Sequence, residues 1–361
     1  MIGPPTAECD TRISVRSHRF FWQLLRGGAL GIAESFMDGH FDTDDLRAVF
    51  DFYLANEQAI TRAYPRFNAT RGRDRLFHRL RRNTRAGSRR NIAEHYDLGN
   101  AFYRLWLDPS MLYSSAIYRA GAEPLETAQR YKVERIVSAL ELSEGHSLLE
   151  IGCGWGALAE AAARSGARVR GITISAQQLV EARERIARAH LDDRAEITFE
   201  DYRDTTGTFD RIVSIEMIEA VGEENWPLYF RTLSDRLNAG GSAVVQAITI
   251  HEGAFEQYRQ NPDFIQRYIF PGGMLPTVGL MRARAAEAGL AFETIEEFGA
   301  SYARTLAEWR RRFEAAWPRI ASLGFDERFR RMWLYYLIYC EVGFDRGLID
   351  VGLYRLRKRA G

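Results

Sequence analysis

Three glycines at alternate positions, Gly152, Gly154 and Gly156, form the motif with the clearest chemical meaning in the chain. They follow an apolar run at 147–151 and precede a segment of helical periodicity, so a turn between a strand and a helix is expected. Such a turn lets a ligand approach the backbone at the open end of a sheet. The spacing is GxGxG, without the GxGxxG of dinucleotide-binding proteins, and Glu150 just before it can engage an ammonium group. The motif favours S-adenosylmethionine over NAD, and a plain strand-to-helix turn is the simpler alternative.

A second group of residues that could bind this ligand lies at 200–202. Glu200, Asp201 and Tyr202 come at the end of an alternating stretch that is expected to be a strand. An acidic side chain there can accept a hydrogen bond from the amino group of an adenine, and the tyrosine ring can lie against the adenine face. The chain thus carries candidate contacts for both ends of the ligand.

These motifs need a framework of alternating strands and helices, and the sequence from about residue 125 has that pattern. Segment 126–142 is amphipathic, and further helical segments follow the glycine-rich turn and the second strand. The expected strands are 147–151, 167–175, 195–200, 209–217 and 240–250. This alternation is typical of a doubly wound α/β sheet. The later stretches 290–298 and 350–358 are expected to add antiparallel edge strands, and the aromatic-rich stretch 302–345 is helical in period.

Composition and pattern divide the chain near residue 90. Residues 1–70 are expected to form a small, mainly helical domain in which glycines at 27, 28, 31 and 39 separate short helices. Residues 71–93 are expected to be an Arg-rich linker, and residues 94–361 to form the larger domain.

The linker is strongly basic, since residues 71–90 hold nine Arg against one Asp while the net charge of the whole chain is only +1. A solvated helix and linker is the simplest interpretation. Leu76, Phe77 and Leu80 could, however, form a short apolar face, and basic residues beside such a face suit an anionic membrane surface. Nucleic acid is not expected as a partner, because no stacking or groove-reading module accompanies the run.

Bulk composition excludes several classes of protein. Apolar residues make up 46% and charged residues 27% of the chain, as in ordinary soluble globular proteins. The sequence contains no run of 18 or more apolar residues and no apolar core typical of a secretory signal. Cys9, Cys153 and Cys340 are scattered, so neither a disulfide framework nor a metal site is expected. We expect a cytoplasmic protein that is peripheral to the inner face of the membrane.

Many phrases of the sequence resemble one family, the cyclopropane fatty acid synthases, which are S-adenosylmethionine-dependent methyltransferases. The matching phrases are EHYDLGNAFYRLWLD (94–108), MLYSSAIY (111–118), LETAQRYK (125–132), LLEIGCGWG (148–156), GITIS (171–175), DYRD (201–204), FDRIVSIEMIEAVG (209–222), YIFPGGMLP (268–276), FGASYARTLAEW (298–309) and RMWLYYL (331–337). Residues 27–46 also resemble the small domain of the longer bacterial members. The resemblance covers nearly the whole chain and implies a Rossmann-like class I methyltransferase sheet of the α/β class.

The resemblance implies a role for particular positions around the cofactor. Contacts with the methionine part are implied for Tyr96, Tyr113 and Ser114, close backbone approach for Gly152 and Gly154, ribose contacts for Thr173, Ser175 and Gln178, and adenine contacts for Asp201 and Tyr202. Segment 268–273 and the helices of 302–345 are expected to line a tunnel for an acyl chain.

The resemblance also implies an anion site. In the well-known bacterial members a bound bicarbonate acts as the base and is held by a Cys, a Glu, a His, a backbone group at an Ile, and a Tyr. Glu219, Ile248 and Tyr302 match three of these positions, whereas Ser115 stands at the Cys position and Gln246 at the His position. A similar pattern occurs in a subgroup that includes the plant cyclopropane synthases. Ser and Gln can still hydrogen-bond an oxyanion, so bicarbonate remains an expected ligand.

The implied reaction is transfer of a methyl carbon from S-adenosylmethionine to the double bond of an unsaturated fatty acyl chain, in a phospholipid. The resulting carbocation closes a cyclopropane ring when a proton leaves the new methyl group. Loss of a proton from a chain carbon would instead give a methyl- or methylene-branched acid. Two other classes stay open, an N-methyltransferase of small amines and a catalytically silent lipid-binding protein. The oligomeric state, including a homodimer, also stays open.

Overall fold

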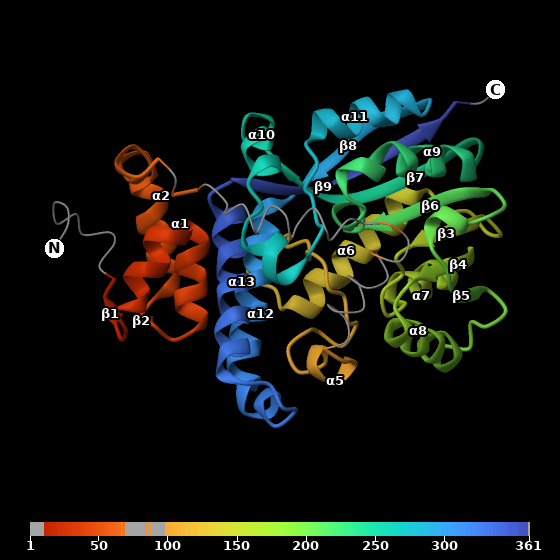
Figure 1. Cartoon of the computed structure of the whole chain (residues 1–361). Helices are drawn as coiled ribbons and strands as arrows, with labels where there is room; N and C mark the ends of the chain where they lie inside the picture. The colour runs from red at the N-terminus through yellow and green to blue at the C-terminus, as the bar shows by residue number, and fades with distance from the viewer. Residues whose placement is uncertain (1–10, 66, 69–83, 85–86, 88–97, 360–361) are drawn as a thin grey trace.

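A seven-stranded sheet forms the centre of the protein, in the order β5-β4-β3-β6-β7-β9-β8 (Figure 1). The computed structural model describes residues 11–65, 67–68, 84, 87 and 98–359. The strands of the sheet are β3 Ser147–Ile151, β4 Arg168–Thr173, β5 Ala195–Phe199, β6 Phe209–Ile215, β7 Leu237–Ile250, β8 Leu290–Glu297 and β9 Ile349–Lys358. The first five pair in parallel, and β9 pairs antiparallel with both β7 and β8. This confirms the expected Rossmann-like sheet.

One expectation about the sheet is wrong. Both late strands are antiparallel as expected, but only β8 lies at an edge, because β9 is inserted between β7 and β8. The middle of β9, from Val351 to Tyr354, is buried on both faces. The backbone of β9 pairs with β7 on one side and with β8 on the other, which makes β9 an interior strand.

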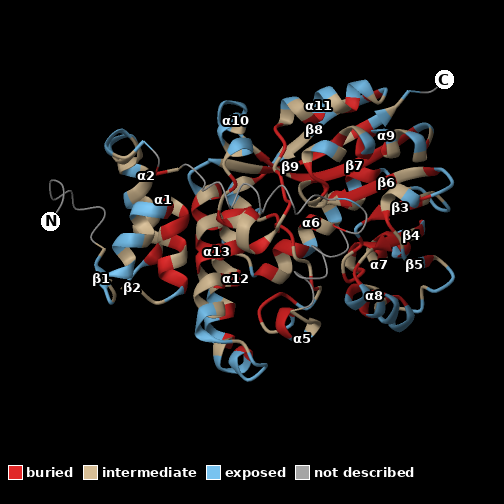
Figure 2. Ribbon diagram, in the orientation of Figure 1, coloured by how far each residue is buried: buried red, intermediate tan, exposed pale blue. Residues whose placement is uncertain are grey.

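Helices cover both faces of the sheet, whose strands are largely buried (Figure 2). Alternate strand residues supply a hydrophobic cluster to each face. Leu148 and Val213 belong to one cluster, whereas their neighbours Leu149 and Ile212 belong to the other, as the two-residue period of a strand requires. The helices are α5 Asn100–Tyr103, α6 Leu125–Leu140, α7 Ala157–Arg164, α8 Ala176–Arg188, α9 Trp226–Arg236, α10 Glu252–Gln260, α11 Val278–Glu287, α12 Gly299–Ala321 and α13 Glu327–Asp345. Short helical turns are η1 Tyr202–Asp204, η2 Ile218–Ala220, η3 Glu223–Asn225 and η4 Ile265–Ile269.

The N-terminal residues form a separate small unit that packs on α13 (Figure 1). It consists of β1 Ile13–Val15, α1 Arg19–Met37, β2 Phe41–Thr43 and α2 Leu46–Ala63, and β1 and β2 pair antiparallel. Ion pairs fasten the unit to α13 and to the residue after it. Arg47 binds Glu341 and Asp345, and Arg346 binds Asp51 at 2.5 Å.

A kink at Gly28 shapes this unit. The expectation that glycines 27, 28, 31 and 39 separate short helices is wrong for 27 and 31, since α1 continues through both. Among the glycines within α1, only Gly28 leaves the helical conformation, with φ of 54° and ψ of −132°. A Cβ atom there would lie 1.9 Å from the carbonyl oxygen of Phe67, so the close approach of residue 67 requires glycine.

The Arg-rich stretch and Tyr96 lie outside the described residues, apart from Thr84 and Gly87 within the stretch. Within the part of the chain that is described, no helix is both long enough and apolar enough to cross a membrane.

Candidate active site

A cavity of about 880 Å³ opens at the carboxyl ends of β3, β4 and β6. It is lined by the turn after β3, segment 110–114, the residues after β6, segment 261–275, and helices α12 and α13. The same cavity extends to α1 and α2 of the N-terminal unit. Its volume lies in the range of ligand sites, and its position at the ends of parallel strands is where open α/β sheets bind ligands.

The glycine-rich turn forms one end of the cavity. Gly152 and Gly154 line it with φ of 80° and 53°, and a Cβ atom on Gly154 would meet no atom within 4 Å. Glu150 is buried beside them, and its Oε2 atom has no hydrogen-bond partner among the described residues. Burial raises the pKa of Glu150 to about 8. An unpaired buried carboxyl beside open space fits a ligand that carries an ammonium group.

Gly156 does not line the cavity but serves helix packing. It has φ of 83°, and a Cβ atom there would lie 3.1 Å from the Cβ of Ala182 in α8. The third glycine of the motif therefore permits close contact between two helices, whereas the first two leave room for a ligand.

The polar residues at the start of α8 bind one another. Ser175 caps the helix by accepting a hydrogen bond from the backbone of Gln178, and Thr173 donates to the side-chain oxygen of Gln178 at 2.9 Å. Thr173 and Gln178 line the cavity, whereas Ser175 does not. The structure thus brings two of the three expected ribose contacts to the cavity and gives Ser175 a capping role.

The expected adenine contacts, Asp201 and Tyr202, also line the cavity. The carboxylate of Asp201 accepts hydrogen bonds from the guanidinium of Arg203 at 2.5 and 2.8 Å. The ring of Tyr202 packs edge-on against Tyr229, with the ring centres 5.8 Å apart. Both side chains are therefore held in place before a ligand arrives.

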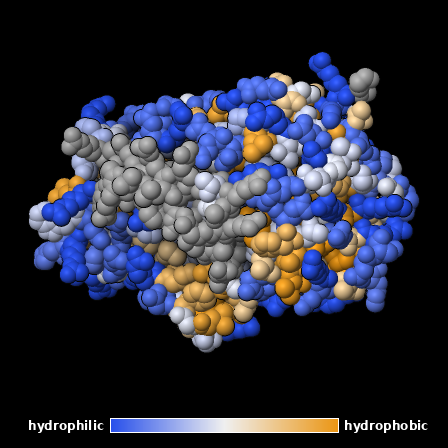
Figure 3. All heavy atoms as spheres, turned by 45° about the vertical axis from the view of Figure 1, so that its right-hand side comes forward, coloured by the Kyte–Doolittle hydropathy of each residue, from blue (hydrophilic) through white to orange (hydrophobic). Residues whose placement is uncertain are grey.

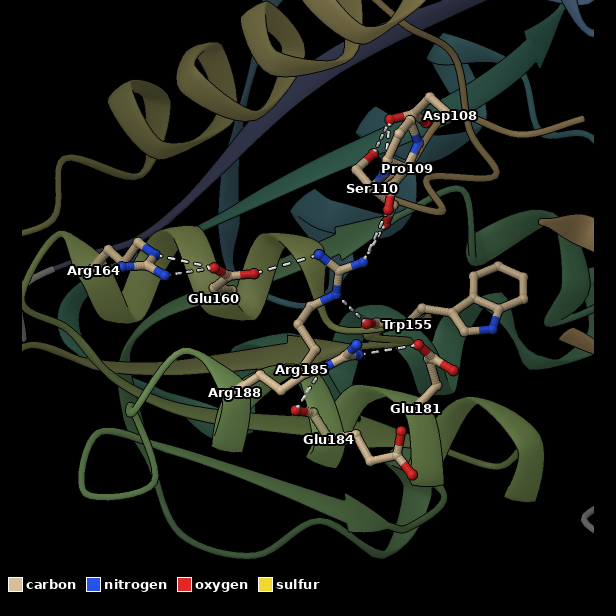
Figure 4. Close-up of polar contacts among 10 residues, drawn as sticks. All are labelled: Asp108, Pro109, Ser110, Trp155, Glu160, Arg164, Glu181, Glu184, Arg185 and Arg188. Atoms are coloured by element: carbon tan, nitrogen blue, oxygen red, sulfur yellow. Dashed lines mark hydrogen bonds and ion pairs between the residues drawn. The ribbon is translucent and has the colours of Figure 1, made fainter.

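Segment 108–115 is held against the glycine-rich turn by Arg185 of α8 (Figure 4). The guanidinium of Arg185 donates to the carbonyl oxygens of Trp155 at 2.9 Å and Ser110 at 3.0 Å, and it pairs with Glu160 at 3.4 Å. This contact positions Tyr113, whose hydroxyl lies 2.8 Å from that of Tyr336.

Ser114 in the same segment accepts a hydrogen bond from the ammonium of Lys132 at 2.6 Å. Lys132 is buried in α6, and burial lowers its pKa to about 8, although the charges of Glu216 and Asp108 oppose the shift. A buried cation next to the cavity was not expected from the sequence, although its phrase LETAQRYK belongs to the family pattern.

Glu216 is the centre of the polar network and was missed by the sequence analysis. Its Oε1 atom accepts from the backbone N–H of Ser115 at 2.9 Å and from the side chain of Gln246 at 2.7 Å, and its Oε2 atom accepts from the hydroxyl of Tyr302 at 2.7 Å. Three residues of the expected anion site therefore converge on this carboxylate. The hydroxyl of Ser115 points elsewhere and donates to the carbonyl oxygen of Ala116 at 2.9 Å.

Glu219 lies one turn further along the chain and has a different environment. Its Oε1 atom accepts from the backbone N–H of Ile248 at 2.6 Å, and its Oε2 atom has no partner among the described residues. Burial raises the pKa of Glu219 to about 8, and the negative charge of Glu216 adds to the rise. Glu219 and Ile248 thus pair with each other and not with the Glu216 network.

The remaining part of the cavity is mainly apolar. It includes Phe270 of the expected tunnel segment and Met274 just after that segment, and it passes between α13 and the N-terminal helices. At its far end are Ile32 of α1 and Val49 and Leu54 of α2. The cavity therefore joins a polar end, suited to a charged ligand, to a mainly apolar channel, which Tyr53 and Glu57 of α2 also line.

Comparison with known proteins identifies the family. The model of the mycolic acid cyclopropane synthetase family matches residues 83–353. The chain belongs to this family. It is an S-adenosylmethionine-dependent methyltransferase, and the open space at Gly154 and the unpaired carboxyl of Glu150 fit that cofactor.

Relatives of this cyclopropane synthetase family member span nearly the whole chain. The tuberculostearic acid methyltransferase UfaA1 of Mycobacterium tuberculosis is 38% identical over 97% of this chain and 84% of its own length. A cyclopropane-fatty-acyl-phospholipid synthase of Escherichia coli is also 38% identical, over 92% of this chain and 84% of its own. The crystal structure of the mycolic acid cyclopropane synthase CmaA1 with SAH and CTAB has a TM-score of 0.70 at 29% identity, over 75% of this chain and 98% of that one.

Cofactor binding by this methyltransferase should release a proton through Glu150. With a pKa of about 8, the unliganded carboxyl is mainly protonated at neutral pH, and a bound ammonium group favours its ionised form. We expect about one proton to be released for each S-adenosylmethionine bound at neutral pH, and less as the pH rises above about 8. Calorimetry in two buffers of different ionisation enthalpy measures this number, and Glu150→Gln should abolish the difference. Equal heats in both buffers for the unmodified protein would refute the role of Glu150.

Proposed function

We propose that this methyltransferase transfers a methyl carbon from S-adenosylmethionine to the double bond of an unsaturated fatty acyl chain in a phospholipid, forming a cyclopropane ring. The observation that carries the proposal is the continuity of the cavity. A cofactor end at Gly152 and Gly154 leads past the half-buried carboxylate of Glu216 into a mainly apolar channel that extends to α2. A small polar substrate would not need such a channel, whereas an acyl chain would fill it.

The residues around the junction suit the chemistry of an alkene. S-adenosylmethionine, when bound, supplies a methyl group on a positively charged sulfur, which is electrophilic enough for a weakly nucleophilic double bond. The attack leaves a positive charge on a chain carbon, and the aromatic faces of Tyr302, Tyr336 and Phe270 line the cavity there. Cation–π attraction to such faces stabilises a desolvated positive charge. The burial of Tyr302 and Tyr336 also keeps away water, which would capture the cation as an alcohol.

Two of the relatives support different products. The name of one specifies tuberculostearic acid, and the name of the other specifies cyclopropane fatty acyl phospholipid, at the same identity to this chain. A branched product is therefore the second candidate for the same substrate class. The choice depends on which proton the base removes from the carbocation.

A substrate competition tests the proposed function. The purified protein is incubated with S-adenosylmethionine and a mixture of an unsaturated phospholipid, the corresponding free fatty acid and a set of small amines, and each class is analysed by mass spectrometry. We expect one added carbon on the phospholipid acyl chain, with the amines unchanged. Modification of the amines alone would establish the N-methyltransferase alternative. Modification of the free fatty acid alone would refute the proposal that the substrate is a phospholipid.

We also propose that the N-terminal unit meets the membrane surface. Six of the eleven large hydrophobic side chains that are exposed among the described residues lie between residues 13 and 52. Phe21, Trp22 and Leu25 are exposed on the first half of α1, next to the exposed Arg19 and Arg26. The protein surface is otherwise mainly hydrophilic on the face in Figure 3, where hydrophobic residues gather in separate patches. Apolar side chains flanked by arginines suit the interface of an anionic bilayer.

Sedimentation with vesicles tests the membrane surface. We expect more protein to bind vesicles of anionic than of neutral phospholipid, and binding to fall as salt is added. Trp22→Asp should weaken binding by about tenfold, because the indole no longer enters the interface. Val180→Asp, at an exposed hydrophobic position on α8, is the matched control and should bind as the unmodified protein does. Equal losses for the two variants would refute this surface.

A further inference from the structure

We propose that the carboxylate of Glu216 is the base that removes the proton from the carbocation, in place of a bound bicarbonate. The inference rests on the proposed function and assigns the residue that completes its reaction. It would make this chain independent of an external anion.

The hydrogen bonds around Glu216 carry the proposal. The backbone N–H of Ser115, the amide of Gln246 and the hydroxyl of Tyr302 all donate to its two oxygens, at 2.7 to 2.9 Å. Those three positions are where the resemblance puts ligands of bicarbonate. The backbone N–H of Ser115, the hydroxyl of Tyr302 and one N–H of the Gln246 amide are thus already used by a carboxylate that belongs to the chain. A second anion would find only the other N–H of that amide among them. It would also face the negative charge of Glu216, so bicarbonate does not fit.

The backbone directs the Glu216 side chain to this point. Glu216 follows the last residue of β6, and its N–H donates to the carbonyl oxygen of Gln246 in β7 at 2.8 Å. It has φ of 48°, a left-handed conformation that residues other than glycine seldom adopt. Such strain is uncommon and is concentrated at functional sites, where the surrounding structure sustains it.

The charges of the two neighbouring carboxyl groups can be assigned from their partners. Glu216 has three donors and the nearby cation Lys132, all of which favour its ionised form, although burial raises its pKa. Glu219 has one donor, and burial and the charge of Glu216 raise its pKa to about 8. Because the charge of Glu216 raises the pKa of Glu219, the two carboxyl groups do not both ionise at neutral pH. Glu216 therefore carries the charge and Glu219 the proton.

The reaction balances with Glu216 as the base. The π pair of the alkene forms a bond to the methyl carbon, and the bond from that carbon to sulfur breaks with its pair left on sulfur. A C–H bond of the new methyl group then breaks, its pair closes the ring, and the proton goes to Glu216. The sulfonium charge and the carboxylate charge are both gone, so the products are neutral. The protonated Glu216 returns its proton to water when the product leaves.

Removal and replacement of the base test the proposal. In buffer freed of carbon dioxide, the unmodified protein should methylate an unsaturated phospholipid at the same rate with and without added bicarbonate. Glu216→Gln should lose about 10²- to 10⁴-fold in rate, the usual contribution of a general base, and should bind S-adenosylmethionine as before. Glu219→Gln should lose less, because Glu219 is already neutral.

A glycine variant gives a second, independent readout. Glu216→Gly keeps a residue type that accepts the positive φ and leaves three donors free around an empty space. Added bicarbonate should bind there and restore part of its activity, with no effect on the unmodified protein. The proposal is overturned if bicarbonate stimulates the unmodified protein, if Glu216→Gln retains full rate, or if Glu219→Gln loses more. An unmodified protein that leaves lipids unchanged would overturn the proposed function, and this assignment with it.

Discussion

Gly154→Val is expected to weaken S-adenosylmethionine binding by at least about 100-fold, a loss of roughly 2.7 kcal/mol. The space beside the α-carbon of Gly154 is open and belongs to the cavity, so the valine side chain would occupy room that the cofactor needs. Its φ of 53° is also unfavourable for a β-branched residue. Calorimetric titration of the folded variant measures the change.

Gly207→Val is the matched control for this loss. Gly207 has φ of 81°, and a Cβ atom there also meets nothing within 4 Å, but the residue does not line the cavity. The two variants therefore introduce the same side chain at a left-handed position. We expect both to lower the melting temperature and only Gly154→Val to lose cofactor affinity. Normal cofactor affinity in Gly154→Val would show that the glycine-rich turn is not part of the cofactor site.

Val49→Trp should reduce kcat/KM for a long-chain phospholipid by about 100-fold and leave cofactor affinity unchanged. Val49 lines the far end of the cavity, in α2, so an indole there shortens the channel and displaces the double bond from the cofactor. A displacement of about 1 Å can cost a factor of this size. The comparison is made by steady-state assay with lipids of different chain length, and shorter chains should be less affected.

Phe52→Trp supplies the control on the same helix. Phe52 is 37% exposed and does not line the cavity. Its replacement should therefore leave kcat/KM and the cofactor affinity near those of the unmodified protein. Equal activity of the Val49 and Phe52 variants on every chain length would mean that the acyl chain does not reach the N-terminal unit.

The strands of the central sheet could be predicted because each has a local pattern. An apolar run such as 147–151 between polar turns has one plausible conformation, and β3 has those bounds. The position of β9 could not be predicted, because strand order depends on contacts with β7 and β8 that lie far away in sequence. The three-residue strands β1 and β2 are too short to have a recognisable period.

In the candidate site, too, local features could be predicted from the sequence and contacts between distant residues could not. Glu150, Gly152 and Gly154 could be predicted to lie together because the turn with the two glycines directly follows the end of β3, which contains Glu150. The role of Glu216 could not, because its partners Ser115 and Tyr302 are 101 and 86 residues away in the chain. The signal in the sequence was an acidic residue directly after an apolar strand, three positions before the expected Glu219.

The measurement that tests methyl transfer to an alkene most directly uses S-adenosylmethionine with a trideuterated methyl group. The purified protein is incubated with this cofactor and an unsaturated phospholipid, and the acyl chains are analysed by mass spectrometry. We predict acyl chains that have gained the labelled carbon, retain two of its three deuterium atoms and no longer contain a carbon–carbon double bond. Ring closure removes one deuterium and the double bond, whereas a methylene branch would remove one deuterium and keep a double bond. Retention of all three would show that the proton leaves from a chain carbon and that the product is branched. Acyl chains of unchanged mass, with S-adenosylmethionine bound, would contradict the proposed function.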